Sequence, residues 1–264
     1  MKKPHIALIY PKTVDYPPLS AVGTARIEAS FQAIQSRELE VEGYALDELP
    51  ASLDGYDFVV ALGGDGTQLH VAQRLLRTPL CAIRLFPERS VGFLCTHDYD
   101  EFEPMIDRIC RHEAAIECLD RLQVAVNGHF LPVPILNDVL IANRCPARGS
   151  RYEITWHDVS QKQCSSGVWI ATQVGSHGAS HSAGAPILEE KGSAVFCVRE
   201  CADRTIETLT SACFKPDEES PQIRIDATAI TLFIDGGIVT VPVSRDDVIT
   251  FRMHPNPLRR LGCP

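Results

Sequence analysis

Residues 57–67 read DFVVALGGDGT, an apolar strand that runs directly into two glycines, an acid, a third glycine and a threonine. Glycines after a strand let the backbone approach a ligand closely, and amide N–H groups in such a turn can bind phosphate oxygens. The carboxylate of Asp65 is unfavourable beside bound phosphate unless it binds a cation or takes a proton. The stretch therefore points to phosphoryl transfer, and an ordinary glycine-rich turn with a solvated Asp65 is the alternative.

The turn differs from two common phosphate-binding motifs. A Walker A loop, GxxxxGK[ST], requires a lysine followed by a hydroxyl residue, and no such pair stands after these glycines. The dinucleotide-binding pattern GxGxxG is not met either. Any phosphate bound here must be held by a different arrangement.

The first hundred residues alternate between strand and helix patterns. We expect strands at 5–10, 39–44, 57–62 and 81–86, and helices at 25–34 and 68–76. This order predicts an α/β domain over residues 1–100, with an open and mostly parallel sheet. Ligands of such domains bind at the carboxyl ends of the strands, which is where the glycine turn lies.

The pattern changes after residue 100. One helix is expected at 101–112, and short strands with turn signals follow at 122–126, 134–142, 152–156, 168–172, 194–198, 222–225, 230–234 and 238–242. An Asp-Gly-Gly turn at 235–237 predicts a hairpin. Residues 101–264 are therefore predicted to form an all-β domain. The stretch 247–260 could extend that domain or return to the first one.

Composition narrows the function classes. The chain has 264 residues and a net charge of −9, which argues against a sequence-independent nucleic-acid binder. Ten cysteines are scattered without a CxxC pair, so we expect buried, reduced thiols and no zinc cluster. The start of the sequence lacks a signal-peptide core, and no apolar run reaches membrane-spanning length. We expect a cytoplasmic protein without a membrane partner.

Two polar residues, Asn137 and Asp138, interrupt the apolar run 134–141. Adjacent residues of a strand face opposite sides, so at most one of the two is expected to face solvent. A buried polar side chain needs a partner, and a bound nucleotide could supply it. An edge strand or a bulge is the alternative.

A third motif, residues 165–186, ends a strand in small and hydroxyl residues, so backbone and substrate can come close. His177 and His181 are spaced for one face of a helix, but the HExxH context of a zinc site is absent. A Ser176–His177 nucleophile pair is disfavoured because no GxSxG elbow exists. Upstream, Arg148 and Arg151 could clamp a phosphate or be solvated loop arginines.

Together these motifs resemble the NAD kinase family. Gly63-Gly64-Asp65-Gly66-Thr67 matches the GGDGT signature, and Leu136-Asn137-Asp138-Val139 matches the LN[ED]V strand. Residues 171–186 resemble the ATPTGSTAYSLSAGGP stretch, residues 91–94 (VGFL) its LGFL, and residues 233–236 its late strand ending in DG. The order is that of the family, and the resemblance covers nearly the whole chain.

A finer resemblance is to the mitochondrial-type branch. There, an arginine-rich stretch precedes a YEI strand, as in residues 148–154, and a QKSSG-like segment precedes the glycine-rich one, as in residues 161–167. Most bacterial members carry an Asp that helps to hold the nicotinamide end, where this chain has Ser166. His177, Gly178 and Ala179 also depart from the family pattern, which implies a roomier and less stacked nicotinamide pocket.

The resemblance implies ATP- and Mg²⁺-dependent phosphorylation of the 2′-hydroxyl of the adenosine ribose of NAD(H). Asp65 is implied to act as the base or orienting acceptor, while the turn amides and Mg²⁺ hold the triphosphate, with no metal site built from protein side chains alone. Asn137 and Asp138 are implied to grip the adenosine half, in a site between the domains. The rest of the acceptor is then lined by Ser166, Gly175, Ser176, His177, Ala179 and Ser182. A homodimer or homotetramer is implied.

Two other classes stay open. Glycine-rich GGDGT turns also occur in diacylglycerol and sphingosine kinases, so the acceptor could be another hydroxyl, on a sugar, a lipid or a nucleoside. The chain could also be a non-catalytic NAD(H) sensor that kept the fold, although the intact Asp65 argues against this.

Overall fold

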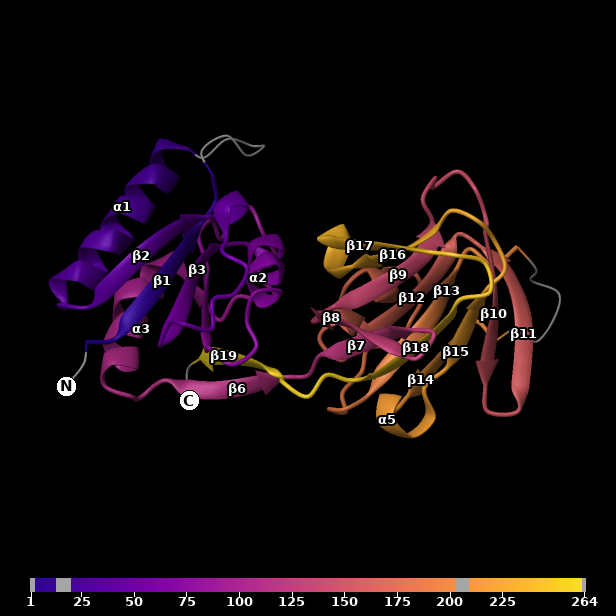
Figure 1. Cartoon of the computed structure of the whole chain (residues 1–264). Helices are drawn as coiled ribbons and strands as arrows, with labels where there is room; N and C mark the ends of the chain where they lie inside the picture. The colour runs from indigo at the N-terminus through magenta and orange to yellow at the C-terminus, as the bar shows by residue number, and fades with distance from the viewer. Residues whose placement is uncertain (1–2, 13–19, 203–208, 263–264) are drawn as a thin grey trace. The chain divides into compact units, whose positions relative to one another are not determined.

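The computed structural model describes residues 3–12, 20–202 and 209–262, which form two compact units (Figure 1). The first, here called the α/β unit, comprises Met1–Leu119 and Asn256–Pro264. The second, the β unit, comprises Asp120–Pro255. The prediction of an α/β domain followed by an all-β domain is confirmed.

The α/β unit is built on one sheet with the strand order β2-β1-β3-β4-β19-β6, and β5 pairs with β4 beside this path. All its pairings are parallel except that of β6 with β19. Its strands are β1 (His5–Tyr10), β2 (Glu40–Ala45), β3 (Phe58–Gly63), β4 (Leu80–Arg84), β5 (His97–Asp98), β6 (Ala115–Leu119) and β19 (Leu258–Gly262). Every residue of β3 is buried, as expected for a central parallel strand.

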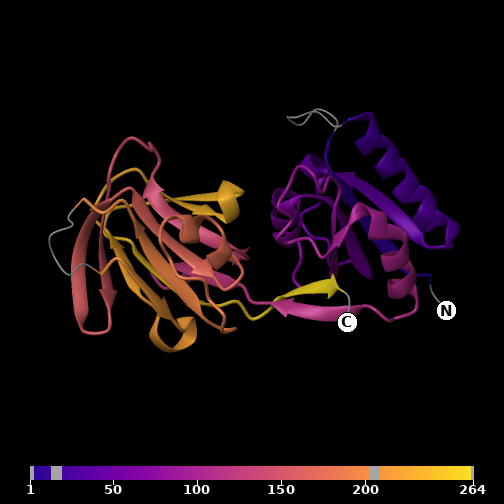
Figure 2. The same cartoon turned by 180° about the vertical axis from the view of Figure 1, so that it is seen from behind.

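Helices cover this sheet. Helices α1 (Ala21–Ser36) and α3 (Phe102–Cys110) lie side by side (Figure 2) and share one apolar core with alternate residues of β1 and β3. Helix α2 (Asp65–Ala72) follows β3, and its buried residues Leu69, Val71 and Ala72 do not belong to that core. Two short 3₁₀ turns are η1 (Leu46–Glu48) and η2 (Tyr99–Glu101). The Ser20 side chain caps α1 by accepting the Gly23 N–H at 3.3 Å.

The β unit has two sheets, each of six strands among the described residues. The first has the order β11-β10-β15-β18-β7-β8, formed by β7 (Leu122–Val126), β8 (His129–Ile135), β10 (Ser150–Trp156), β11 (Val159–Ser165), β15 (Gln222–Ile225) and β18 (Val248–Met253). The second has the order β14-β13-β12-β9-β16-β17, formed by β9 (Asp138–Asn143), β12 (Gly167–Thr172), β13 (Ala194–Arg199), β14 (Ser211–Phe214), β16 (Ile230–Ile234) and β17 (Val239–Val243).

Both sheets contribute to one apolar core, because alternate residues of their strands are buried together. Examples are Ile154 and Ile223 from the first sheet and Val139, Ile170 and Leu232 from the second. Short helical turns decorate the unit: η3 (Gly175–His177), α4 (Ala179–Ser182), α5 (Pro216–Glu219) and η4 (Asp235–Gly237). The predicted hairpin forms, with η4 joining the antiparallel strands β16 and β17.

Two features differ from what the sequence predicts, and the alternative left open for the last stretch is resolved. The α/β unit extends past residue 100 to Leu119, because α3 and β6 belong to it. The last stretch does both things considered: β18 extends the β unit, and β19 returns to the first sheet between β4 and β6. The run 134–142 is two strands, not one, because β8 and β9 belong to different sheets and the chain bends at Leu136 and Asn137.

The expectation of buried cysteines is also wrong for most of them. Of the nine cysteines in the described ranges, only Cys81 and Cys197 are buried, and five are exposed. Within the same ranges, no helix has the length and apolar character needed to cross a membrane.

Candidate functional site

The glycine turn lies where β3 passes into α2, at the carboxyl end of the parallel strands. Gly64 is the N-cap of α2, in an extended conformation, and no side chain caps the helix. A Cβ on Gly63 would lie 2.1 Å from the Thr67 hydroxyl oxygen, so only glycine fits beneath the first helical turn. The first amides of α2 therefore have no capping side chain as acceptor. A phosphate bound at this turn could accept their hydrogen bonds.

Asp65 begins α2, and its carboxylate is held beside this turn by a neighbouring loop. Its Oδ1 accepts the Leu94 N–H at 2.7 Å and its Oδ2 the Gly92 N–H at 3.1 Å. The Arg84 guanidinium fixes the same loop by donating to the Ser90 and Val91 carbonyls at 3.2 and 2.8 Å. The Asp65 carboxylate is half-buried, and two backbone donors orient it.

The bend between β8 and β9 carries Asn137 and Asp138 and is joined to the third motif. The Thr172 hydroxyl donates to the Leu136 carbonyl at 2.6 Å, and the Thr172 N–H donates to the Asn137 carbonyl at 2.9 Å. Gly175 packs so closely that a Cβ there would lie 1.9 Å from the Asn137 carbonyl oxygen. These two sequence motifs therefore form one cluster at one end of the second sheet.

Two buried polar groups stand out in this cluster. The Asn137 Oδ1 atom is buried and has no hydrogen-bond donor within the described structure. Asp138 is 5% exposed, and burial, reinforced by the nearby Asp235 carboxylate, raises its pKa to about 7. Neither observation is usual for a structural core, and both fit a site that a polar ligand completes.

Residues 175–182 form the short helical turns η3 and α4. The buried Ser176 hydroxyl donates to the Gln173 carbonyl at 2.7 Å and accepts the Leu188 N–H at 2.9 Å, so it holds a turn in place. His177, Ala179 and Ser182 are exposed, in η3 and α4. Among the residues that the structure describes, no three His, Cys, Asp or Glu side chains gather where they could hold a metal ion.

Arg148, Arg151 and Ser166 lie elsewhere. In the pairing of β9 with β12, Ala171 stands opposite Asp138 and Val168 opposite Ile141, so Ser166 is at the other end of both strands. The two arginines are exposed in the connection after β9 and at the start of β10, towards that same end. Six residues of β9 separate the two ends, which corresponds to roughly 20 Å.

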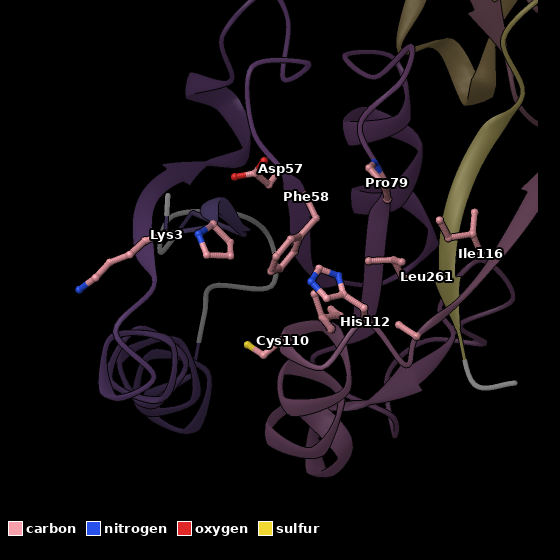
Figure 3. Close-up of a pocket in the computed structure, with 11 residues that line it drawn as sticks. Lys3, Asp57, Phe58, Pro79, Cys110, His112, Ile116 and Leu261 are labelled. Carbon is pink, nitrogen blue, oxygen red and sulfur yellow. The ribbon is translucent and has the colours of Figure 1, made fainter. Parts of the chain in front are cut away.

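A cavity of 640 Å³ in the α/β unit lies at the opposite edge of the sheet from the glycine turn. Figure 3 shows side chains that line it, among them Phe58 and Pro79, which stand at the amino ends of β3 and β4. Ile116 of β6 and Leu261 of β19 line it as well. None of the site residues predicted from the sequence lines this cavity.

The structure adds groups that sequence reasoning did not assign to the site. The Gly92 and Leu94 amides orient Asp65, Thr172 ties two motifs together, and Asp235 approaches the bend at Leu136–Asp138. The signal for Asp235 is an acid directly before two glycines, which predicts a hairpin turn, and the family resemblance of residues 233–236 assigns Asp235 no role. Residues 91–94 resemble a family motif, but a sequence pattern does not reveal that the amides of residues 92 and 94 donate to Asp65.

Comparisons with known proteins place the chain in a class. No protein-family model matches it. It is 31% identical over 193 residues to an NAD kinase of Methanothermobacter thermautotrophicus, an alignment that covers 69% of this chain and 66% of that protein. It is 28% identical over 177 residues to a probable NADH kinase of Oryza sativa, covering 59% and 54%. The alignments span about half of the first curated relatives, between 50% and 59% of their length.

A solved structure has the same fold. The crystal structure of an NAD kinase from Archaeoglobus fulgidus in complex with ATP has a TM-score of 0.75 to this chain, at 24% identity, and covers 97% of this chain and 92% of that one. The class that this fold defines has a mostly parallel sheet, with GGDGT at the end of one strand, followed by a two-sheet β unit. Within that class, the sequence comparisons support the NAD kinase family for this chain.

Proposed function

We propose that the protein transfers the terminal phosphoryl group of ATP to the 2′-hydroxyl of the adenosine ribose of NAD(H), giving NADP(H). The observation that carries the proposal is the Asp65 carboxylate, held by two backbone amides at the start of α2 beside an uncapped glycine turn. Phosphoryl transfer needs little covalent chemistry from a protein, but it needs a positioned carboxylate and donors for phosphate oxygens. This turn supplies both.

Asp65 acts on the attacking hydroxyl, as the acceptor of its hydrogen bond and proton. The amides of Gly64, Asp65, Gly66 and Thr67 bind phosphate oxygens, because no side chain caps α2. When bound, Mg²⁺ would be held through the nucleotide phosphates and would neutralise their charge. The half-buried Asp65 carboxylate offers oxygen ligands of the kind that Mg²⁺ prefers, so it fits a metal that the nucleotide phosphates bring to the turn.

The bend at Asn137 and Asp138 binds the adenosine half of the acceptor. The buried Asn137 Oδ1 accepts a hydrogen bond from the ligand, which removes the cost of an unpaired buried oxygen. Gly175 lets the third motif approach this bend, and Ser176 fixes the turn in front of it. The exposed residues His177, Ala179 and Ser182 line the remaining, more open part of the acceptor site.

The protein works as a homodimer or homotetramer in the cytoplasm. Ser166, Arg148 and Arg151 lie roughly 20 Å from Asn137 within one chain, at the far end of β9 and β12. Both ends of the sheet contact one dinucleotide only if they come from different protomers. Analytical ultracentrifugation at several protein concentrations tests this part, and a monomer at all of them contradicts it.

The activity is tested by product mass. Purified protein with ATP, Mg²⁺ and NAD should yield a product heavier than NAD by one phosphoryl group, and chelation of Mg²⁺ should stop its formation. NADH in place of NAD tests the reduced acceptor in the same assay. ADP release without phosphorylated dinucleotide, or phosphorylation of another hydroxyl compound alone, contradicts the proposal.

A further inference from the structure

Asp235 occupies an unusual place for an acid, at the point where β16 passes into η4. Its φ is 47°, and those of Gly236 and Gly237 are 72° and 86°, so three successive residues are left-handed. Few side chains adopt this conformation, although Asp tolerates it better than most. Asp235 is also only 1% exposed. A buried carboxylate on such a backbone needs strong partners to offset both costs.

Its partners are three consecutive backbone amides. Asp235 Oδ2 accepts the Leu136 N–H at 3.1 Å, and Oδ1 accepts the Asn137 and Asp138 N–H groups at 2.8 and 3.3 Å. Hydrogen bonds to an ionised acceptor are roughly twice as strong as neutral ones. One side chain therefore satisfies every amide of the bend that leads from β8 into β9.

The bend depends on such an acceptor because it connects strands of two different sheets. Strand β16 pairs with β9 up to Ile234 and Val139, so the ladder stops just before the bend, and Asp235 continues it with a side chain. From the other side, Thr172 and Gly175 contact the carbonyls of Leu136 and Asn137. Amides and carbonyls of the bend are thus held by different elements.

We propose that Asp235 is a positioning residue for the dinucleotide: its carboxylate holds the bend at residues 136–138 in the shape that presents Asn137 and Asp138 to the adenosine half. The inference rests on the proposed function for the identity of the ligand, but the positioning itself is a property of the free protein. Asp235 touches no substrate in this scheme and acts through its neighbours.

The same carboxylate acts on the protonation of Asp138. Burial and Asp235, which faces Asp138 from η4, are the two causes that raise the Asp138 pKa. Loss of the Asp235 charge removes the second cause and leaves the first. The midpoint of any pH dependence that Asp138 gives to dinucleotide binding should therefore move to lower pH, while remaining above that of an ordinary carboxyl group.

The test is the substitution Asp235→Asn, with Asp246→Asn as its matched control. Asn keeps the size of the side chain and tolerates a left-handed backbone, but it offers one acceptor oxygen where Asp offers two. Asp246 also has a positive φ, 71°, and its side chain is 73% exposed in the same unit. We expect the KM for NAD to rise about tenfold in Asp235→Asn, with the KM for ATP and kcat changed less than about threefold. Asp246→Asn should behave as the wild type.

Amide hydrogen exchange reads the positioning without any turnover. In the wild type, the amides of residues 136–138 should be protected, and in Asp235→Asn they should exchange at least about tenfold faster. If the wild-type amides are unprotected, the inference is overturned even if the variant does not fold. It is also overturned if Asp235→Asn keeps the wild-type KM for NAD and its pH profile. A wild-type chain that forms no NADP instead refutes the proposed function, and exchange still decides whether Asp235 holds the bend.

Discussion

The two units of this protein use the same device in two ways. In each, an aspartate next to glycine accepts backbone N–H groups from a neighbouring segment: Asp65 from Gly92 and Leu94, and Asp235 from the bend at residues 136–138. The difference is burial. Asp65 is half-buried at the edge of its sheet, whereas Asp235 is 1% exposed.

This difference in burial separates a catalytic role for Asp65 from a positioning role for Asp235. A carboxylate that solvent and ligand can reach is able to take part in proton transfer, and the amides that it accepts only orient it. The Asp235 carboxylate instead accepts three backbone amides with its two oxygens, so its hydrogen bonds serve to shape the bend at residues 136–138. Substitutions on the two sides should therefore fail in different ways: one in turnover, the other in binding and stability.

The largest effect is expected from Asp65→Asn. The amide retains an acceptor for one of the two loop amides but is a far weaker base, so kcat should fall at least about a hundredfold. The melting temperature should change little, because the side chain is only half-buried and Asn keeps one of its two acceptor bonds. ADP release and thermal unfolding measure the two properties, and the exposed Asp100→Asn serves as the control. Wild-type turnover in Asp65→Asn would refute the assignment of Asp65 as the acting carboxylate.

Gly175→Ala should disturb the bend at residues 136–138, which Asp235 holds. Its Cβ would lie 1.9 Å from the Asn137 carbonyl oxygen, so the bend and the third motif must move apart. We expect a loss of about 1–3 kcal/mol in the free energy of unfolding and a raised KM for NAD. Chemical denaturation and steady-state kinetics test this. Gly149→Ala, whose Cβ would meet its nearest atom at 3.4 Å, is the control, and equal stability of the two variants contradicts the packing argument.

Asp138→Asn sharpens the comparison through its pH dependence. The Asp138 pKa is raised to about 7, well above its ordinary value of 3.8, so the folded protein keeps this proton where the unfolded chain has lost it. Its contribution to stability therefore decreases as pH rises from about 4 to about 7, by about 1.4 kcal/mol for each unit of pKa difference.

The neutral amide removes that penalty. Asp138→Asn should thus unfold at a higher temperature than the wild type near pH 8, and the gain should shrink towards pH 5. Between pH 5 and pH 8, the affinity of Asp138→Asn for NAD should be lower than that of the wild type. Thermal unfolding across pH measures the first effect, and a difference independent of pH would contradict the assigned protonation.

The smallest effect is expected at Ser166, which lies outside both aspartate sites. Its hydroxyl donates to the Glu200 carboxylate at the far end of β12, where both groups reach solvent. Because exposed hydrogen bonds contribute little, Ser166→Ala should raise the KM for NAD by no more than about threefold. The rise should be confined to protein concentrations at which oligomers form, and a rise independent of concentration would contradict a site shared between protomers.

Local patterns predicted much of the fold. Strand β3 and the glycine turn were evident because an uninterrupted apolar run ends in three closely spaced glycines. The break between β8 and β9 was not, since Ile135, Leu136 and Val139 are buried on both sides of it, and burial alone does not reveal a change of sheet. The return of β19 was left open for a related reason, because its pairing partners lie more than a hundred residues away.

The site shows the same limit. The positions of Asp65, Asn137 and Gly175 could be selected from their residue types, because each is a chemically unusual choice for its place in the chain. The loop amides that orient Asp65 and the approach of Asp235 depend on tertiary contacts. A sequence pattern specifies side chains, and these contacts are made by the backbone.

Strand β19 gives this chain an order of assembly. The β unit is one continuous segment, whereas the first sheet needs β19, which follows that whole segment, to connect β4 with β6. During synthesis the ribosome therefore delivers every residue of the second unit before the first sheet can close. Until then, the nascent first unit exposes an open strand edge, where a chaperone or a wrong partner could bind.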